Sequence, residues 1–131
     1  DAASLRTREP KRDTHLKSSD FFDVARFPKI SFTSKRVEGP LDGDFKLVGD
    51  LTIRDVTREV TLKVESSGGV VDPWGGERTG YAATTKINRK DFGLTWNVAL
   101  EAGGVMVGDE VKISIEVELV KQTAPVAPVA A

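Results

Sequence analysis

The chain lacks the residues on which several kinds of chemistry depend. None of its 131 residues is cysteine, and only one, His15, is histidine. The missing cysteines exclude disulfides, thiolate metal sites and thiol nucleophiles, and they leave the redox compartment open. A single histidine excludes a histidine-rich metal site as well. We therefore predict no metal site and no redox chemistry of the chain itself.

Long hydrophobic runs and an excess of one charge are also missing. No window approaches the roughly 18 to 20 consecutive apolar residues of a membrane span. The 19 Lys and Arg residues against 20 Asp and Glu leave a formal net charge of −1, so no overall field would attract nucleic acid or an anionic membrane. We expect a soluble protein with no nucleic acid partner and no stable membrane insertion.

What remains is the composition of an ordinary globular protein. Hydrophobic residues make up 39% and charged residues 30% of the chain, which is not the composition of a disordered protein. A chain of this length forms one domain with one core, predicted over residues 1–121. The Pro/Ala/Val run of residues 122–131 predicts a disordered tail.

Apolar residues alternate with polar ones between Lys29 and Val120, which predicts strands with one buried face. The clearest run extends from Val111 to Leu119, and similar runs occupy residues 45–53, 60–64 and 81–87. An antiparallel meander is the simplest topology. Turn residues separate the runs at 38–43, 67–69, 72–76 and 103–109.

The segment from Glu9 to Val24 breaks this alternation. Its charges, its serines and its apolar cluster predict one or two short helical turns capped by serine or threonine, lying across one end of the sheet. Only five or six strands are predicted in all, whereas a barrel with room for a small ligand needs about eight. Either the sheet is open or strands are missing.

Three stretches carry longer motifs that together cover nearly all of residues 6–119. The first runs from Arg12 to Ser34, the second from Gly49 to Thr57, and the third from Gly80 to Gly108, including Arg89-x-Asp91-Phe92-Gly93-Leu94-x-Trp96-Asn97. These motifs are far more specific than a short glycine pattern. In them the chain resembles the YceI-like family of bacterial polyisoprenoid-binding proteins.

The resemblance implies an all-β, antiparallel, lipocalin-like barrel with one or two short helices. Such proteins usually carry a few more strands before the position of Asp1, so we expect a fragment or processed product whose barrel is incomplete at the N-terminus. The implied function is to carry or store a long-chain isoprenoid, either a polyprenyl phosphate or an isoprenoid quinone, with no other cofactor. A homodimer is also implied, while an exported and a cytoplasmic location both stay open.

The lipid would lie against apolar side chains of the alternating strands and of the third motif. Each buried methylene contributes about 0.8 kcal/mol before ordering costs, so chain burial would dominate the affinity. Periodicity alone favours the alternative of a packed core, as in a non-catalytic interaction or scaffold domain. The predicted lining consists of Phe32, Leu47, Leu51, Ile53, Leu62, Tyr81, Ile87, Phe92, Leu94, Trp96, Val111, Ile113, Ile115 and Val117.

Polar residues near the first motif suggest a site for the head group. Arg8, Arg12 and His15 are predicted to meet a phosphate or quinone at the barrel mouth, and the alternative is a structural hydrogen-bond cluster. No catalytic residue is predicted, because Ser18 and Ser19 lack a nucleophile-elbow pattern and the glutamates alternate with apolar residues and so face water. An enzyme acting on a prenylated substrate would need inward titratable groups, and we predict that the protein is not an enzyme.

Overall fold

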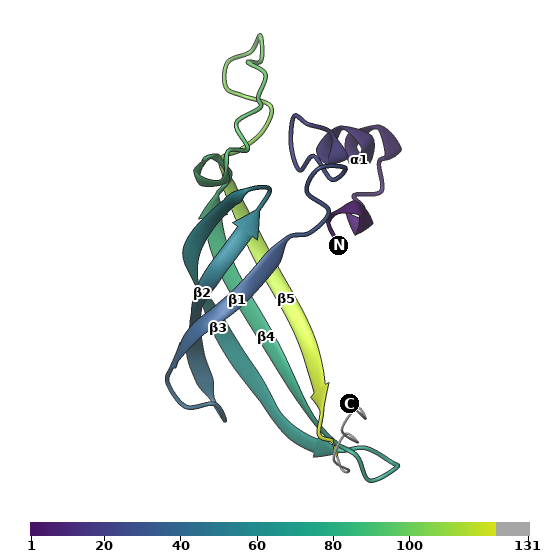
Figure 1. Cartoon of the computed structure of the whole chain (residues 1–131), viewed down its shortest axis with the longest axis vertical. Coiled ribbons are helices and arrows are strands. Elements are labelled where there is room, and N and C mark those ends of the chain that lie inside the picture. Colours follow the sequence, from purple (N-terminus) through teal and green to yellow (C-terminus); the bar gives the residue numbers. More distant parts are fainter. Residues whose placement is uncertain (123–131) are drawn as a thin grey trace, which may run out of the picture.

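A computed structural model describes residues 1–122, so residues 123–131 of the predicted tail lie outside the described part of the chain. The fold is a five-stranded antiparallel sheet in the order β1-β2-β3-β4-β5 (Figure 1), which confirms the predicted all-β meander. The elements are η1 (Ala2–Ser4), α1 (Pro10–Lys17), β1 (Ser31–Glu38), β2 (Asp44–Ile53), β3 (Val56–Val71), β4 (Glu77–Asn88), η2 (Arg89–Phe92) and β5 (Glu110–Val120).

One predicted turn is wrong. The Ser67-Gly68-Gly69 stretch is a bulge inside β3, where the pairing with β4 shifts register between Ser66 and Gly69. Gly68 adopts a φ of 79°, which glycine tolerates without strain. Because the Ser67 hydroxyl donates to the Gly80 carbonyl at 3.1 Å, the strands stay joined past the bulge. The chain reverses only at residues 72–76.

The predicted helical segment is present as α1, but no serine or threonine caps its start. Its N-cap is Glu9, which makes no side-chain cap, and Pro10 occupies the first turn, where its missing N–H costs nothing. A serine lies instead at the C-terminal end of the helix, where the Ser18 hydroxyl donates to the His15 carbonyl at 2.6 Å. As predicted, α1 lies at one end of the sheet (Figure 1).

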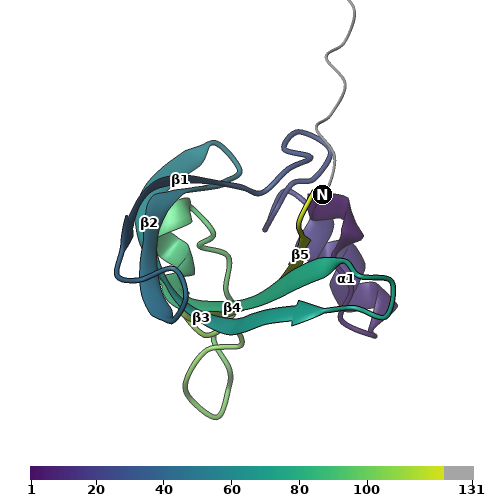
Figure 2. The same cartoon turned by 90° about the horizontal axis from the view of Figure 1, so that it is seen from below.

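The sheet curls around η2 and forms an open trough (Figure 2). Within residues 1–122, β1 and β5 are the two edges of the sheet and do not pair with each other. The sheet is therefore open in the described part of the chain, and the lipocalin-like barrel that the resemblance implies is not closed there. We call the concave face of the sheet the trough.

The two ends of the trough differ. At the end that carries η2 and α1, here the packed end, the core consists of Leu51, Ile53, Ile87, Phe92 and Leu94. At the other end, here the open end, lie the turns that join β1 to β2 and β3 to β4. Gly49 on β2 lets the edge strand approach, because a Cβ at this position would lie 2.5 Å from Cζ of Phe32.

Candidate functional site

The register of the sheet brings most of the predicted lining residues to the trough. Residues that face each other across antiparallel strands point to the same side. Leu47 is opposite Leu62, and Tyr81 is opposite Val117. The predicted residues on this face are Phe32, Leu47, Leu51, Ile53, Leu62, Tyr81, Ile87, Val111, Ile113, Ile115 and Val117.

On the edge strand β5, exposure of the trough side chains rises from the packed end, where Val111 is 37% exposed, toward the open end, where Leu119 is 57% exposed. On the inner strands, Ile53, Leu62 and Ile87 are only 4%, 6% and 8% exposed, whereas Ile115 and Val117 on β5 are 40% and 47% exposed. The side chains that are buried at the packed end are covered by η2 and the residues after it. The trough is thus filled at the packed end, and its exposed apolar side chains lie in a row along β5.

The remaining predicted lining residues come from the third motif, not from the strands. Phe92, 2% exposed, and Leu94, 4% exposed, fill the packed end. Trp96 packs instead against the N-terminal segment, with its ring centroid 4.5 Å from that of His15 and 5.4 Å from that of Phe21. Phe92 and Leu94 therefore form a plug, and Trp96 joins the plug region to α1.

The three predicted head-group residues lie in and just before α1, where two of them contact groups of their own segment. His15 Nε2 lies 2.9 Å from Asp20 Oδ2, and Arg12 Nη2 donates to the Thr7 carbonyl at 2.7 Å. Both side chains thus bind groups of their own segment, and their role toward a head group stays a prediction. Arg8 lines a hollow of about 680 Å³, together with Arg6, Pro10 and Asp13.

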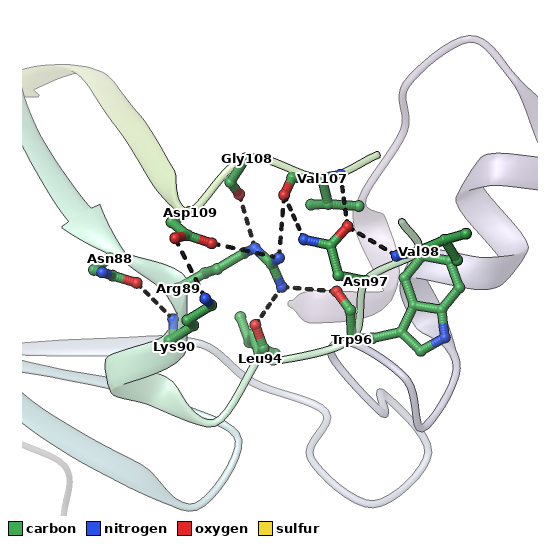
Figure 3. A network of polar contacts seen from close by, with 10 residues as sticks. All are labelled: Asn88, Arg89, Lys90, Leu94, Trp96, Asn97, Val98, Val107, Gly108 and Asp109. Carbon is green, nitrogen blue, oxygen red and sulfur yellow. Dashed lines mark hydrogen bonds and ion pairs between the residues drawn. The ribbon is translucent and has the colours of Figure 1, made fainter. Parts of the chain in front are cut away.

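A functional residue that the sequence interpretation missed is Arg89. Its side chain is 3% exposed and its guanidinium donates to four backbone carbonyls (Figure 3). The acceptors are Leu94, Trp96, Val107 and Gly108, with Nε of Arg89 2.8 Å from the Gly108 oxygen. The arginine thereby ties the start of the β4–β5 connection to its end. The sequence signal that could have identified Arg89 was its position inside the third motif, directly after an alternating strand.

Asn97 completes this closure. Its amide nitrogen donates to the Val107 carbonyl at 2.7 Å, and its amide oxygen accepts the Val107 N–H at 2.9 Å and the Val98 N–H at 2.9 Å (Figure 3). Residues 97–107 consequently form a loop with a fixed base. We call this segment the 97–107 loop.

A polar cluster fixes the turn at the open end. The carboxylate of Asp72 accepts from Arg78 Nε at 2.9 Å and from the Gly76 N–H at 2.8 Å. Both bonds hold the pKa of Asp72 below its ordinary value, and the bond from Arg78 has the larger effect. The pKa of Arg78 is raised by its hydrogen bonds to Glu118, which has the larger effect, and to Asp72.

Residues 1–122 contain neither a cluster of metal-ligating side chains nor a membrane-spanning helix. Nowhere in this range do three or more His, Asp or Glu side chains form a group that could hold a metal ion. No helix in the same range has the length and apolar character needed to cross a membrane.

Comparison with known proteins gives a consistent result. The model of the YceI-like domain matches residues 1–119. UPF0312 proteins of Staphylococcus aureus strains MSSA476 and MW2 are each 44% identical over 117 residues, which are 88% of this chain and 66% of the relative. The chain thus spans just under two thirds of the length of these curated relatives.

Solved structures resemble the chain in fold. The crystal structure of the Campylobacter jejuni YCEI protein matches with a TM-score of 0.80 and 31% identity, over 92% of this chain and 68% of that one. Burkholderia cenocepacia BcnA matches with a TM-score of 0.73 and 20% identity, over 91% of this chain and 70% of that one. The second likeness concerns the fold alone.

Proposed function

Because the chain belongs to the YceI-like family, we propose that it binds a long-chain isoprenoid lipid along the trough and carries or stores it. The cargo we propose is a polyprenyl phosphate or an isoprenoid quinone. The observation that carries the proposal is the apolar trough, which stays exposed beyond the plug. It is a proposal of binding without catalysis.

The surface chemistry of the trough suits an apolar chain. Burying an unpaired polar group costs a few kcal/mol, and two polar side chains on this face, Arg58 and Thr85, already have partners. Arg58 Nε donates to the Asp91 carbonyl at 3.2 Å, and the Thr85 hydroxyl donates to the Thr61 carbonyl at 3.0 Å. A hydrocarbon lying here would therefore remove apolar area from water with little polar cost.

The plug limits where the lipid would lie. Phe92 and Leu94 occupy the packed end, so the lipid would extend from the middle of the trough to the open end. β5 alone has 11 residues, which at about 3.4 Å per residue gives roughly 37 Å of strand. The half-exposed side chains on this path, Ile115, Val117 and Leu119, would lose their contact with water.

Mass spectrometry of the purified chain under native conditions, followed by organic extraction, tests the proposal. We expect a co-purifying polyprenyl compound at close to one per chain, or uptake of added undecaprenyl phosphate or ubiquinone. A chain that is empty and takes up neither compound would overturn it. The same spectra would report the mass of one or of two chains, which tests the homodimer that the resemblance implies.

A second function is favoured by the two free edges of the sheet. Within the described residues, β1 and β5 each have one side without a neighbouring strand, and exposed strand edges can pair with a partner. A chain without lipid that captures a strand from a partner would make a non-catalytic interaction domain the better description.

A further inference from the structure

We propose that the 97–107 loop and the basic segment around α1 together form a docking surface for an anionic lipid bilayer. This inference rests on the proposed function for its purpose, because a lipid carrier must meet a membrane to load or release its cargo. Its physical basis is separate from the trough and lies at the packed end.

The 97–107 loop exposes several apolar side chains. Leu100, Val105 and Met106 are 44%, 55% and 60% exposed, and Val98 is 41% exposed. Glu101 is the one charged residue in the loop. A contiguous group of exposed apolar side chains on a projecting segment is typical of an interaction site, and Figure 1 shows the loop extending beyond the sheet.

The base of the loop is fixed before any partner binds. Arg89 and Asn97 hold its two ends together, and Ala99 and Val105 form an isolated antiparallel bridge. Gly103 and Gly104 at the tip have φ values of 90° and 83°, which close the turn. A preorganised loop loses little conformational entropy when its apolar side chains enter another phase.

Positive charge lies beside this loop. Residues 6–17 contain five basic side chains and two acidic ones, Glu9 and Asp13, which gives 5 − 2 = +3. The rest of the chain then carries −1 − 3 = −4, so the field is local and directional although the total is −1. Contact between the rings of His15 and Trp96 joins α1 to the base of the loop, and both lie at the same end of the molecule (Figure 1).

This combination points to a membrane surface of negative charge. Basic side chains are attracted to anionic lipids over about a Debye length, and apolar side chains then enter the interface. A second copy of the chain is a poorer partner at this surface, because the two basic segments would repel each other. Docking of this kind is reversible and needs no membrane-spanning segment.

Binding of the 131-residue chain to vesicles free of isoprenoid tests the proposal. The vesicles contain phosphatidylcholine, with or without phosphatidylglycerol, and bound protein is measured by sedimentation. We expect binding to the anionic vesicles, weakened by salt. The double variant Leu100→Ser/Met106→Ser should bind at least about tenfold more weakly, because two side chains no longer leave water. Lys11→Gln/Lys17→Gln should bind more weakly to the anionic vesicles only.

A matched control comes from the open end. Val70 and Val71 are 62% and 69% exposed there, and Val70→Ser/Val71→Ser should leave vesicle binding unchanged. Trp74, 86% exposed at the same end, reports the orientation. In a Trp96→Phe chain, where Trp74 is the one tryptophan, brominated lipids should leave the fluorescence unchanged, and they should quench a chain with Leu100→Trp, Trp74→Phe and Trp96→Phe. Circular dichroism would verify that each variant is folded.

Several results would overturn the proposal. Among them are no binding of the unaltered chain to anionic vesicles, equal binding by the loop variant, and an equal loss in the Val70/Val71 control. Self-association that Leu100→Ser/Met106→Ser abolishes would assign the loop to a second copy instead. If vesicle binding fails while mass spectrometry still detects bound isoprenoid, only the docking surface is refuted and the proposed function stands.

Discussion

The packed end and the open end of the trough are built from the same alternating strands, yet they differ in what covers them. At the packed end, Ile53 and Ile87 lie under Phe92 and Leu94 and are almost fully buried. At the open end, Val117 and Leu119 continue the alternation of β5 but stay about half exposed. Alternation therefore selects a face of the sheet without determining whether that face becomes core or binding surface. At the packed end the covering plug makes it core, and along the edge strand β5 the same face stays exposed.

The sharpest test of this difference removes one large side chain from each end. Phe92→Ala leaves a cavity in the packed end and should lower the free energy of unfolding by about 3–5 kcal/mol. Leu119→Ala, the matched change at a position that is 57% exposed, should cost less than about 1 kcal/mol. Urea denaturation measures both values. Similar losses for the two variants would mean that the ends are packed alike.

The next largest effect is expected from replacing Arg89, which ties together the two ends of the β4–β5 connection. Arg89→Met would leave backbone carbonyls of Leu94, Trp96, Val107 and Gly108 without their donor, and we expect a loss of about 3 kcal/mol. Arg89→Lys should recover part of this, because an ammonium group reaches fewer of the acceptors. The neighbouring Lys90→Met, which removes an exposed ion pair with Asp109, should cost less than about 1 kcal/mol.

A charge on the trough should separate binding from folding. Ile115→Glu alters a side chain that is 40% exposed, so the variant should fold, with a loss of roughly 1 kcal/mol or less. Its affinity for undecaprenyl phosphate should fall at least about tenfold, since the lipid would have to cover a carboxylate. Fluorescence titration measures the affinity. Loss of the fold without a specific loss of binding would favour a packed core.

The smallest expected effect concerns pH at the open end. Since its bonds to Arg78 and Gly76 hold the pKa of Asp72 below its ordinary value of 3.8, Asp72 stabilises the fold fully above pH 3.8. That contribution is lost as the pH falls through the lower, folded-state pKa. The difference in melting temperature between the chain and Asp72→Asn should therefore narrow as the pH falls below 3.8. A difference that is the same at neutral and acidic pH would exclude this linkage.

Periodicity and turn residues were enough to predict the strands and their common face. The run from Val111 to Leu119 became β5, and Tyr81 and Ile87 face the same side as predicted. The glycine pair after Ser67 was misread because glycine serves a bulge as well as a turn. A bulge is distinguished from a turn only by the pairing with the next strand, β4, where the Gly80 carbonyl accepts a bond from Ser67.

The candidate site was harder to predict, because its special residues act through contacts between distant segments. Phe92 and Leu94 look like lining residues in the sequence, and only the path of the chain after η2 makes them a plug. The head-group role of His15 stays a prediction, and its contacts with Asp20 and Trp96 were not predicted from the sequence. Arg89 binds backbone carbonyls, which carry no side-chain identity, so no pattern of residue types marks its partners.

The meander order has a consequence for how the protein folds. β2 and β3 are joined by two residues, Arg54 and Asp55, whereas β4 and β5 are joined by the 21 residues from Arg89 to Asp109. Closing the longer connection costs about 2 kcal/mol more chain entropy, and the bonds of Arg89 across its base form only when it has closed. We expect the β2–β3 hairpin to form early and β5 to dock last. Pulsed hydrogen exchange would then detect protection in β2 before β5, and the trough would be completed by the final step of folding.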